Sequence, residues 1–257
     1  MMRKNLPHYT RFVFFKVIAN LKSESSRNYL SYLWWIIEPL LQMVLFYLVF
    51  GVLLRRGTEN FVVFLMTGLI PWLWFNKSLN HGMNSIQQGK GLMMQVHIPK
   101  IIFPSVSIFQ NAIKQTVVML LLLIFLFFAG VSPSFSWLTL PALFATEFLM
   151  ITCCTFALAL VVPFLPDLRV IIPFFLQALM FGSGVFYSLD MISPDKRELF
   201  YILNPMANLL ANYRAVLLEH RLPNWTAMGI ISLVSFCLTA FLCQVAHRLD
   251  RVYPRVV

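Results

Sequence analysis

The sequence has few charged residues and is rich in apolar ones. Of its 257 residues only 12% are charged and 59% are hydrophobic, and the mean hydropathy is +0.76. A water-soluble domain cannot bury that much apolar surface, so the composition excludes an ordinary soluble protein and indicates an integral membrane protein. No internal repeat or low-complexity linker divides the chain, and one domain over residues 1–257 is sufficient for this length.

Cofactor-binding patterns are also missing. The four cysteines lack the spacing of a metal site, and all lie in apolar runs where they are expected to be small buried hydrophobic residues. Gly89-Lys90-Gly91 is no phosphate-binding loop, because that loop needs Ser or Thr in place of Gly91 and glycine in place of Asn84. We therefore expect no metal and no nucleotide cofactor in this chain.

Six apolar runs are each near the ~20 residues that a helix needs to cross a bilayer. They predict an all-α integral membrane protein with six transmembrane helices. The runs cover about residues 32–54, 60–79, 106–129, 137–165, 170–188 and 225–247.

The distribution of lysine and arginine predicts the orientation. With the N-terminus placed in the cytoplasm, most of the 20 Lys and Arg residues fall on the cytoplasmic side, as the positive-inside rule requires. Both termini are then cytoplasmic, and so is the segment between the second and third runs. This topology accounts for the net charge of +10, so no nucleic-acid partner is expected.

Residues 7–27 have the pattern of an amphipathic helix lying in the membrane interface. Apolar and polar residues recur at helical spacing on opposite faces, and the basic side chains would lie near anionic lipid headgroups. A simple basic anchor is the alternative interpretation. The apolar face consists of Phe14, Val17, Ile18 and Leu21. The polar face consists of Lys16, Asn20, Ser23 and Arg27.

The first apolar run contains a polar and aromatic face. Trp34, Glu38 and Gln42 follow at intervals of four residues, so they share one side of a helix, and Trp35 lies beside them. A carboxylate at that depth rarely faces lipid, and aromatic rings beside hydrogen-bonding groups suit sugars. We predict that this face points to protein or lines a water-filled channel that suits a sugar chain. Interfacial tryptophan anchoring with a kink at Pro39 is the alternative.

The fifth run has a similar stripe. Phe174, Gln177 and Phe181 lie on one helical face, and we predict that they form a second wall of the same channel. A plain helix-packing stripe is the alternative. Glu147, in the middle of the fourth run, is predicted either to pair with Lys114 or to be protonated.

Residues 189–224, between the fifth and sixth runs, are not simply polar. Apolar residues recur at helical spacing on both sides of Asn204-Pro205, and proline interrupts a helix, so we predict two short re-entrant helices at the outer membrane surface. We expect them to close the external mouth of the channel, with Arg214 near the headgroups. An ordinary folded loop is the alternative. The predicted gate residues are Asn204, Pro205, Leu209, Leu210, Tyr213, Arg214 and Leu217.

Five motifs resemble, in their order along the chain, those of ABC-2-type permeases that export polysaccharides. The resemblance covers nearly the whole chain and fits six spans, although Ser31 stands where glycine is common. The motifs are YLSYLWWIIEPLLQM, GLIPWLWF (Gly68–Phe75), HIPKIIFPS (His97–Ser105), LPDLRVIIPF (Leu165–Phe174) and ILNPMANLLANYR (Ile202–Arg214).

The resemblance implies partners and a location. Two copies of the chain would form a channel in the bacterial inner membrane and bind two cytoplasmic ABC ATPase subunits, which hold the ATP and Mg. The cargo would be a lipid-linked polysaccharide such as O-antigen or capsule, and the chain itself would be no enzyme. Residues 82–104, including the stretch GKGLMMQVHIPK, resemble the coupling region that contacts the ATPase. The side chains expected there are Lys90, Met93, Met94, Val96, Ile98 and Lys100.

Other protein classes remain open. An ABC-2 permease for a small molecule or drug has the same six-span plan, and an oily channel face without Trp, Gln and Glu would favour it. A membrane glycosyltransferase would need carboxylate pairs or histidine clusters in a membrane-facing loop, and the sequence has none. A proton-coupled carrier could use Glu38 and Glu147, but the repeat between halves that such carriers show is missing.

Overall fold

The computed structural model describes residues 6–27, 31–53, 61–95, 98–189 and 193–249. Within these ranges the chain forms helices and no β-strand. In chain order the helices are α1 (Leu6–Arg27), α2 (Ser31–Phe46), the π-helix η2 (Tyr47–Leu53), α3 (Phe61–Met83), α4 (Ser85–Gln88), α5 (Lys90–Gln95), α6 (Ile102–Phe128), the 3₁₀ helix η3 (Phe135–Thr139), α7 (Leu140–Val161), α8 (Leu168–Gly182), α9 (Pro194–Leu203), α10 (Pro205–Leu217) and α11 (Trp225–Leu249).

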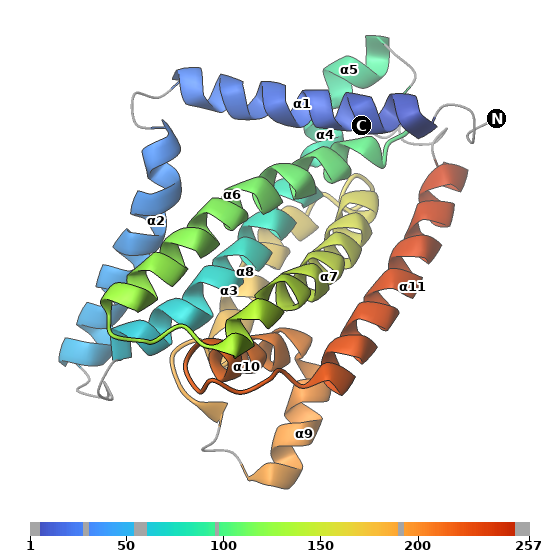
Figure 1. Ribbon diagram of the computed structural model, residues 1–257. Helices are drawn as coiled ribbons and strands as arrows, with labels where there is room; N and C mark the ends of the chain where they lie inside the picture. The colour runs from blue at the N-terminus through green and yellow to red at the C-terminus, as the bar shows by residue number, and fades with distance from the viewer. Residues whose placement is uncertain (1–5, 28–30, 54–60, 96–97, 190–192, 250–257) are drawn as a thin grey trace.

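The helices form a bundle with α3 at its centre. α3 packs against α2, α6, α7, α8 and α10, and every residue from Leu65 to Phe75 is buried. A helix that is apolar on all sides suits such a position. α11 packs mainly against α7 and stands at the edge of the bundle (Figure 1).

The two ends of the bundle differ. α1 lies across one end, together with α4 and α5, and α10 lies at the opposite end, from which α9 projects (Figure 1). We refer to these as the α1 end and the α10 end. α11 begins at the α10 end and finishes at the α1 end, so its C-terminal end and α1 lie at the same end of the bundle (Figure 1).

Within the described ranges, four segments are long and apolar enough to cross a membrane: Phe61–Met83, Ile102–Phe128, Phe135–Val161 and Trp225–Arg248. They correspond to the second, third, fourth and sixth predicted runs. The other two runs form shorter apolar helices, over Leu33–Val49 and Leu168–Gly182.

The helix of the fifth run is shorter than predicted. α8 has 15 residues and stops at Gly182 rather than continuing to residue 188. At ~1.5 Å per residue it is about 22 Å long, less than the ~30 Å of a bilayer core. The chain turns at Gly184, whose φ of +71° lies in the left-handed region that glycine tolerates. Among the described residues, four helices therefore have the length and composition to cross a membrane, and a count of six spans remains a prediction.

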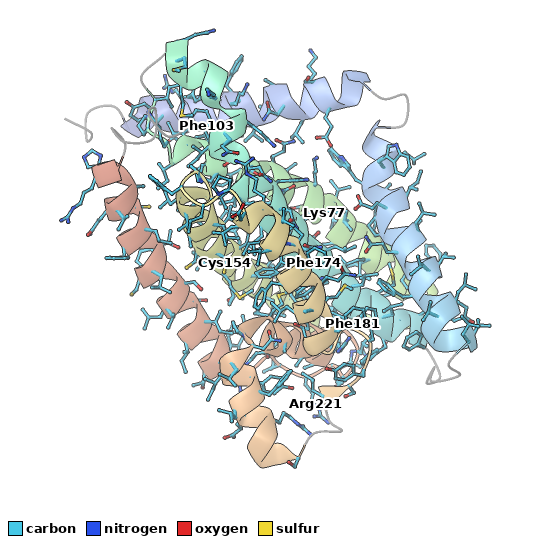
Figure 2. All side chains as sticks on the ribbon, turned by 180° about the vertical axis from the view of Figure 1, so that it is seen from behind. Lys77, Phe103, Cys154, Phe174, Phe181 and Arg221 are labelled. Atoms are coloured by element: carbon cyan, nitrogen blue, oxygen red, sulfur yellow. The ribbon has the colours of Figure 1, made fainter. Side chains whose placement is uncertain are left out.

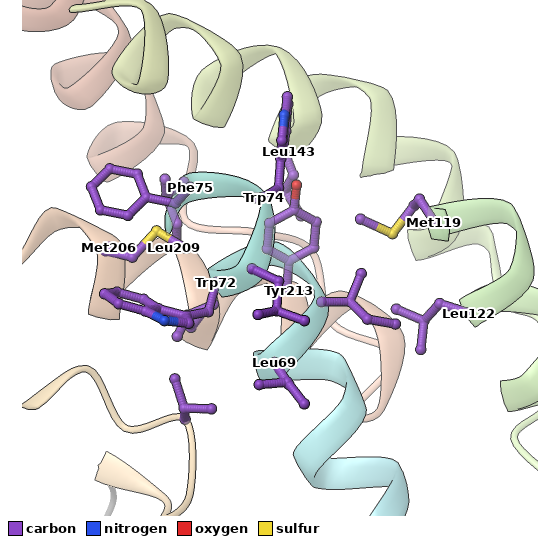
Figure 3. Packing of buried hydrophobic residues seen from close by; sticks show 14 of the residues in the cluster. Leu69, Trp72, Trp74, Phe75, Met119, Leu122, Leu143, Met206, Leu209 and Tyr213 are labelled. Carbon is purple, nitrogen blue, oxygen red and sulfur yellow. The ribbon is translucent and has the colours of Figure 1, made fainter. Parts of the chain in front are cut away.

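The hydrophobic core lies where α3, α6, α7 and α10 meet (Figure 3). Leu69 and Trp72 of α3 and Leu209 and Tyr213 of α10 are all 0% exposed. α10 is therefore part of the core rather than a peripheral loop.

Much of the outer surface is apolar. Large hydrophobic side chains are exposed along α2, α8 and α11, among them Leu41, Leu45, Phe174, Phe175, Leu233 and Phe236. Soluble monomers rarely expose continuous apolar surface on this scale. These faces suit contact with lipid or with another membrane subunit, as expected of a membrane protein.

Candidate functional site

Two ion pairs join four helices at the α1 end. Lys77 of α3 donates from Nζ to Oε2 of Glu38 on α2 at 2.7 Å. Nζ of Lys114 on α6 lies 2.6 Å from both carboxylate oxygens of Glu24 on α1. The four side chains keep exposed fractions of 17–45%, so each pair contributes only about 0–1 kcal/mol. Their main effect is to set the positions of α1 and α2 relative to the α3–α6 pair.

Further contacts surround Glu24. Nε2 of Gln110 donates to Oε2 of Glu24 at 3.1 Å, and Oε1 of Gln110 accepts from Asn20 at 3.3 Å. Both oxygens of Glu24 therefore have donors. The ammonium of Lys114 also lies 5.3 Å from the centroid of the Trp35 ring, within the range of a cation–π contact.

Two cavities adjoin this network. The larger, of about 690 Å³, lies between α1, α6 and the α3–α5 segment, and the smaller, of about 270 Å³, lies between α2, α3 and α6. His81 Nδ1 and Asn111 Oδ1 are 3.2 Å apart, and both residues line both cavities. We call the group that surrounds the cavities the α1 junction; it consists of Glu24, Glu38, Lys77, His81, Asn111 and Lys114.

The structure places most of the predicted α2 face against this junction. Trp34, Trp35 and Glu38 line the smaller cavity. Gln42 is half-buried one turn further along and is not among the lining residues. Three of the four residues thus face a cavity of mixed polar and apolar lining inside a single chain.

The predicted stripe on α8 lies elsewhere. Phe174, Gln177 and Phe181 are exposed, and none of them lines either cavity; Figure 2 shows Phe174 and Phe181 along α8. Phe186, which follows α8, connects the ends of the two helices. Its ring centroid lies 4.6 Å from that of Phe46 on α2 and 5.4 Å from that of Phe181 on α8. The two predicted walls are not brought together within one chain, and their joint role in a channel stays a prediction.

The predicted coupling residues have two kinds of environment. Two are exposed: Lys90 and Met94. Met94 has an exposed fraction of 68%. Three are buried: Met93, Ile98 and Lys100. The buried ones support the segment from inside, since Met93 packs in a cluster with α4, α7 and α11 residues, whereas Ile98 packs against α1 and α6. Val96 lies outside the described residues.

At the α10 end, Glu147 of α7 has a partner that the sequence did not indicate. The hydroxyl of Tyr213 donates to Oε2 of Glu147 at 2.8 Å, and both residues are 0% exposed. The predicted pairing of Glu147 with Lys114 is therefore wrong. Lys114 bonds to Glu24 at the α1 end, whereas Glu147 lies about two turns from the start of α7, which begins at the α10 end. The alternative of a protonated Glu147 stays a prediction.

Arg214 is buried rather than placed near headgroups as predicted. Its Nη1 donates to the carbonyl of Gly184 at 2.7 Å and its Nη2 to that of Val185 at 2.8 Å. The guanidinium also lies 3.7 Å from the centroid of the Phe64 ring. The turn after α8 leaves carbonyl groups that need donors away from water, and Arg214 supplies two of them.

Asn204 connects the same turn to α10. Its Nδ2 donates to the carbonyl of Gly182 at 3.2 Å and to Oγ of Ser183 at 3.0 Å. Its Oδ1 accepts from the amide of Ala207 at 3.1 Å, which caps the first turn of α10. Pro205 occupies the first helical position, where its missing amide donor has no cost. The remaining predicted gate residues are fully buried: Leu209, Leu210 and Leu217.

Several residues of the α1 junction were not predicted as site residues. His81 follows Lys77 by four positions, and Lys114 follows Asn111 by three, so each pair shares a helical face within an apolar helix. Polar residues at such spacing inside apolar runs are a signal of a shared polar site. The sequence could therefore have indicated this face of α3 and of α6, but not that the two faces meet.

These features define a multi-helix membrane protein with one polar junction at the α1 end and a buried, hydrogen-bonded helix at the α10 end. Residues 15–218 match the family model of the ABC-2 type transporter, and the chain belongs to this family.

Curated relatives match almost end to end. The chain is 28% identical over 236 residues to the O-antigen export system permease protein RfbA of Myxococcus xanthus, and this match covers 91% of each chain. It is 25% identical over 244 residues to the RfbA protein of Klebsiella pneumoniae, covering 94% of this chain and 93% of the relative. It is 24% identical over 223 residues to the polysialic acid transport protein KpsM of Escherichia coli, covering 83% and 82%.

Proposed function

We propose that this chain is the membrane-spanning subunit of an ATP-driven exporter that moves a lipid-linked polysaccharide across the bacterial inner membrane. One observation carries the proposal: relatives named for O-antigen export or polysialic acid transport match 83% or more of the chain. The Trp34–Trp35–Glu38 face supports it, because rings beside hydrogen-bonding groups suit a sugar chain better than an apolar drug.

The α1 end is assigned to the cytoplasm. α1 carries Arg11, Lys16 and Lys22, and the last turn of α11 carries Arg248, so basic residues are gathered at this end, as the positive-inside rule requires. In this orientation α1 lies at the inner membrane surface and α10 lies at the outer end. With α2 and α8 counted as spans, both termini are cytoplasmic.

The ATPase partner is proposed to contact α4 and α5. These short helices lie at the cytoplasmic end and follow directly on α3. Met94 is 68% exposed there and Lys90 is exposed beside it, which offers an apolar and a basic contact to a partner. α3 runs from this contact to the core around α10. A displacement of α4 and α5 would therefore be transmitted to the outer end through α3.

A dimer of the chain is proposed to form the channel. Phe174, Gln177 and Phe181 are exposed on α8, and α2 has an exposed apolar face, so a second copy could bring these surfaces together. α10 would then close the outer end in the resting state. The residues of this chain would bind and position the cargo and exclude water. ATP with Mg would be bound and hydrolysed on the partner subunit.

Deletion of the gene in its native host tests the proposed function. The account predicts that the surface glycan disappears and that lipid-linked glycan accumulates on the cytoplasmic side, where it is protected from a glycan-specific antibody in intact spheroplasts and exposed after lysis. Complementation with the intact chain should restore the surface glycan. Normal surface glycan in the deletion strain, together with increased sensitivity to a small amphiphilic compound, would instead support export of a small molecule.

A further inference from the structure

The larger cavity at the α1 junction is not explained by the proposed channel. Its volume of about 690 Å³ lies within the ~300–1,000 Å³ of small-molecule sites. It lies between α1 and α6 and is lined by none of the predicted channel residues, but it shares Glu24, His81, Asn111 and Lys114 with the smaller cavity. A space of this size between a membrane-surface helix and the bundle is large enough for a lipid headgroup.

One part of the cavity wall is polar and carries an unmatched positive charge. Lys16 and Lys114 line it together with a single carboxylate, Glu24. Glu24 is already bonded to Lys114, whose ammonium contacts both of its oxygens. Within the described part of the chain Lys16 has no ion pair, so the cavity has one cation in excess.

A buried amide donor also lies in the cavity wall. Asn111 is 6% exposed, and its Nδ2 has no hydrogen-bond partner among the described residues, although its Oδ1 lies 3.2 Å from His81 Nδ1. Leaving a buried N–H group unbonded costs about 1–3 kcal/mol. A ligand oxygen that reached this amide after a small shift of the covering side chains would remove this cost.

The remainder of the wall mixes apolar side chains with further polar ones, among them Ser85, Gln88 and Gln110. Phe12 of α1 and Phe103 and Val106 of α6 line the cavity beside the polar groups. The site thus offers a cation and an amide donor to one part of a ligand and aromatic and aliphatic surface to another, which is the complement of an amphiphile with an anionic head.

We propose that this cavity binds the phosphate group of a lipid in the cytoplasmic leaflet, with Lys16 and Asn111 as its donors and Phe12 and Phe103 against the first part of the tail. The inference rests on the assignment of α1 to the inner membrane surface, but it does not depend on the cargo being a polysaccharide. The excess charge favours a phosphate over a neutral sugar, and the apolar wall favours a lipid over free phosphate.

Native mass spectrometry of the full-length chain, purified in detergent as its native oligomer and delipidated, tests the proposal. The probes are dioleoyl phosphatidic acid, dioleoyl phosphatidylglycerol, undecaprenyl diphosphate, inorganic diphosphate and phosphate-free dioleoylglycerol. Loss of one charged donor should weaken binding about tenfold or more, so Lys16→Gln is expected to lower the affinity for the phosphate lipids by that factor. The matched control is Lys22→Gln, which removes the same charge from an exposed position on α1 that does not line the cavity.

The outcomes separate the sources of the phosphate. Binding of all three phosphate lipids that is weakened by Lys16→Gln indicates a structural lipid, and binding of undecaprenyl diphosphate alone indicates a carrier lipid of the cargo; both support the site. Equal binding of dioleoylglycerol, equal losses in Lys16→Gln and Lys22→Gln, or binding of inorganic diphosphate alone would overturn it. A Lys16→Gln variant that binds lipid normally but no longer retains its ATPase would also overturn the proposal, because Lys16 would then contact the ATPase rather than a lipid.

Discussion

The hydrogen bond between Tyr213 and Glu147 should be worth a measurable coupling free energy. Both residues are 0% exposed, and no other hydrogen bond of the Glu147 carboxyl group is found among the described residues. Tyr213→Phe leaves that carboxyl unbonded, and Glu147→Leu leaves the tyrosine hydroxyl unbonded, and each such loss costs about 1–3 kcal/mol. The double variant removes both polar groups, so its destabilisation should be smaller than the sum of the two single effects.

We expect a coupling free energy of about 1–2 kcal/mol, at the upper end of what hydrogen bonds inside membrane proteins show. The assay is reversible unfolding of the purified protein in SDS, followed by circular dichroism, for the wild type, both single variants and the double variant. Tyr187→Phe is the matched control, because it removes the same atom from an exposed residue whose hydroxyl donates to the Phe181 carbonyl at 3.0 Å. It should change stability by no more than about 0.5 kcal/mol. A coupling energy indistinguishable from zero would refute the conclusion that this bond holds α10 to α7.

Three further predictions concern packing, coupling and the channel. Gly82→Ala should destabilise the protein by about 1–3 kcal/mol in the same SDS assay, because the added methyl group would overlap a threonine side chain of α7, whereas Gly229→Ala on α11 meets nothing within 4 Å and should be neutral or stabilising. Met94→Asp should reduce co-purification of the ATPase while leaving the stability of the permease unchanged, whereas Met93→Asp should destabilise the permease itself because the Met93 side chain is buried. Normal ATPase retention by the Met94 variant would contradict the assignment of α5 to the ATPase contact. A cysteine at Gln177, in a background without other cysteines, should react with a water-soluble maleimide during ATP turnover, and protection in every state would place that face of α8 in lipid or protein.

The sequence allowed the coarse architecture to be predicted because each feature depends on local properties. Apolar runs of sufficient length gave the four long helices, and their limits differ from the structure by only a few residues. The break between α9 and α10 follows from Asn204-Pro205, where the side chain caps a helix and the proline can only begin one.

The arrangement of polar groups could not be predicted, because it depends on which helices become neighbours. Glu147 and Lys114 are both unusual in apolar runs, and their pairing was a reasonable expectation, but they lie toward opposite ends of the bundle. The burial of Arg214 likewise depends on the turn after α8, whose carbonyl groups create a need for donors that no local pattern reveals. A surface dominated by apolar side chains also gives no sequence signal that separates lipid contact from contact with a second copy.

ATP-dependent translocation of a lipid-linked glycan in proteoliposomes tests the central claim most directly. The chain would be reconstituted with its ATPase, so that the cytoplasmic face is outward, and supplied with radiolabelled lipid-linked polysaccharide from the same host. We predict that ATP causes the label to become protected from an added glycosidase, and that vesicles holding the ATPase without this chain show no protection. ATP hydrolysis that is stimulated by this chain without any protection of the glycan would contradict the account.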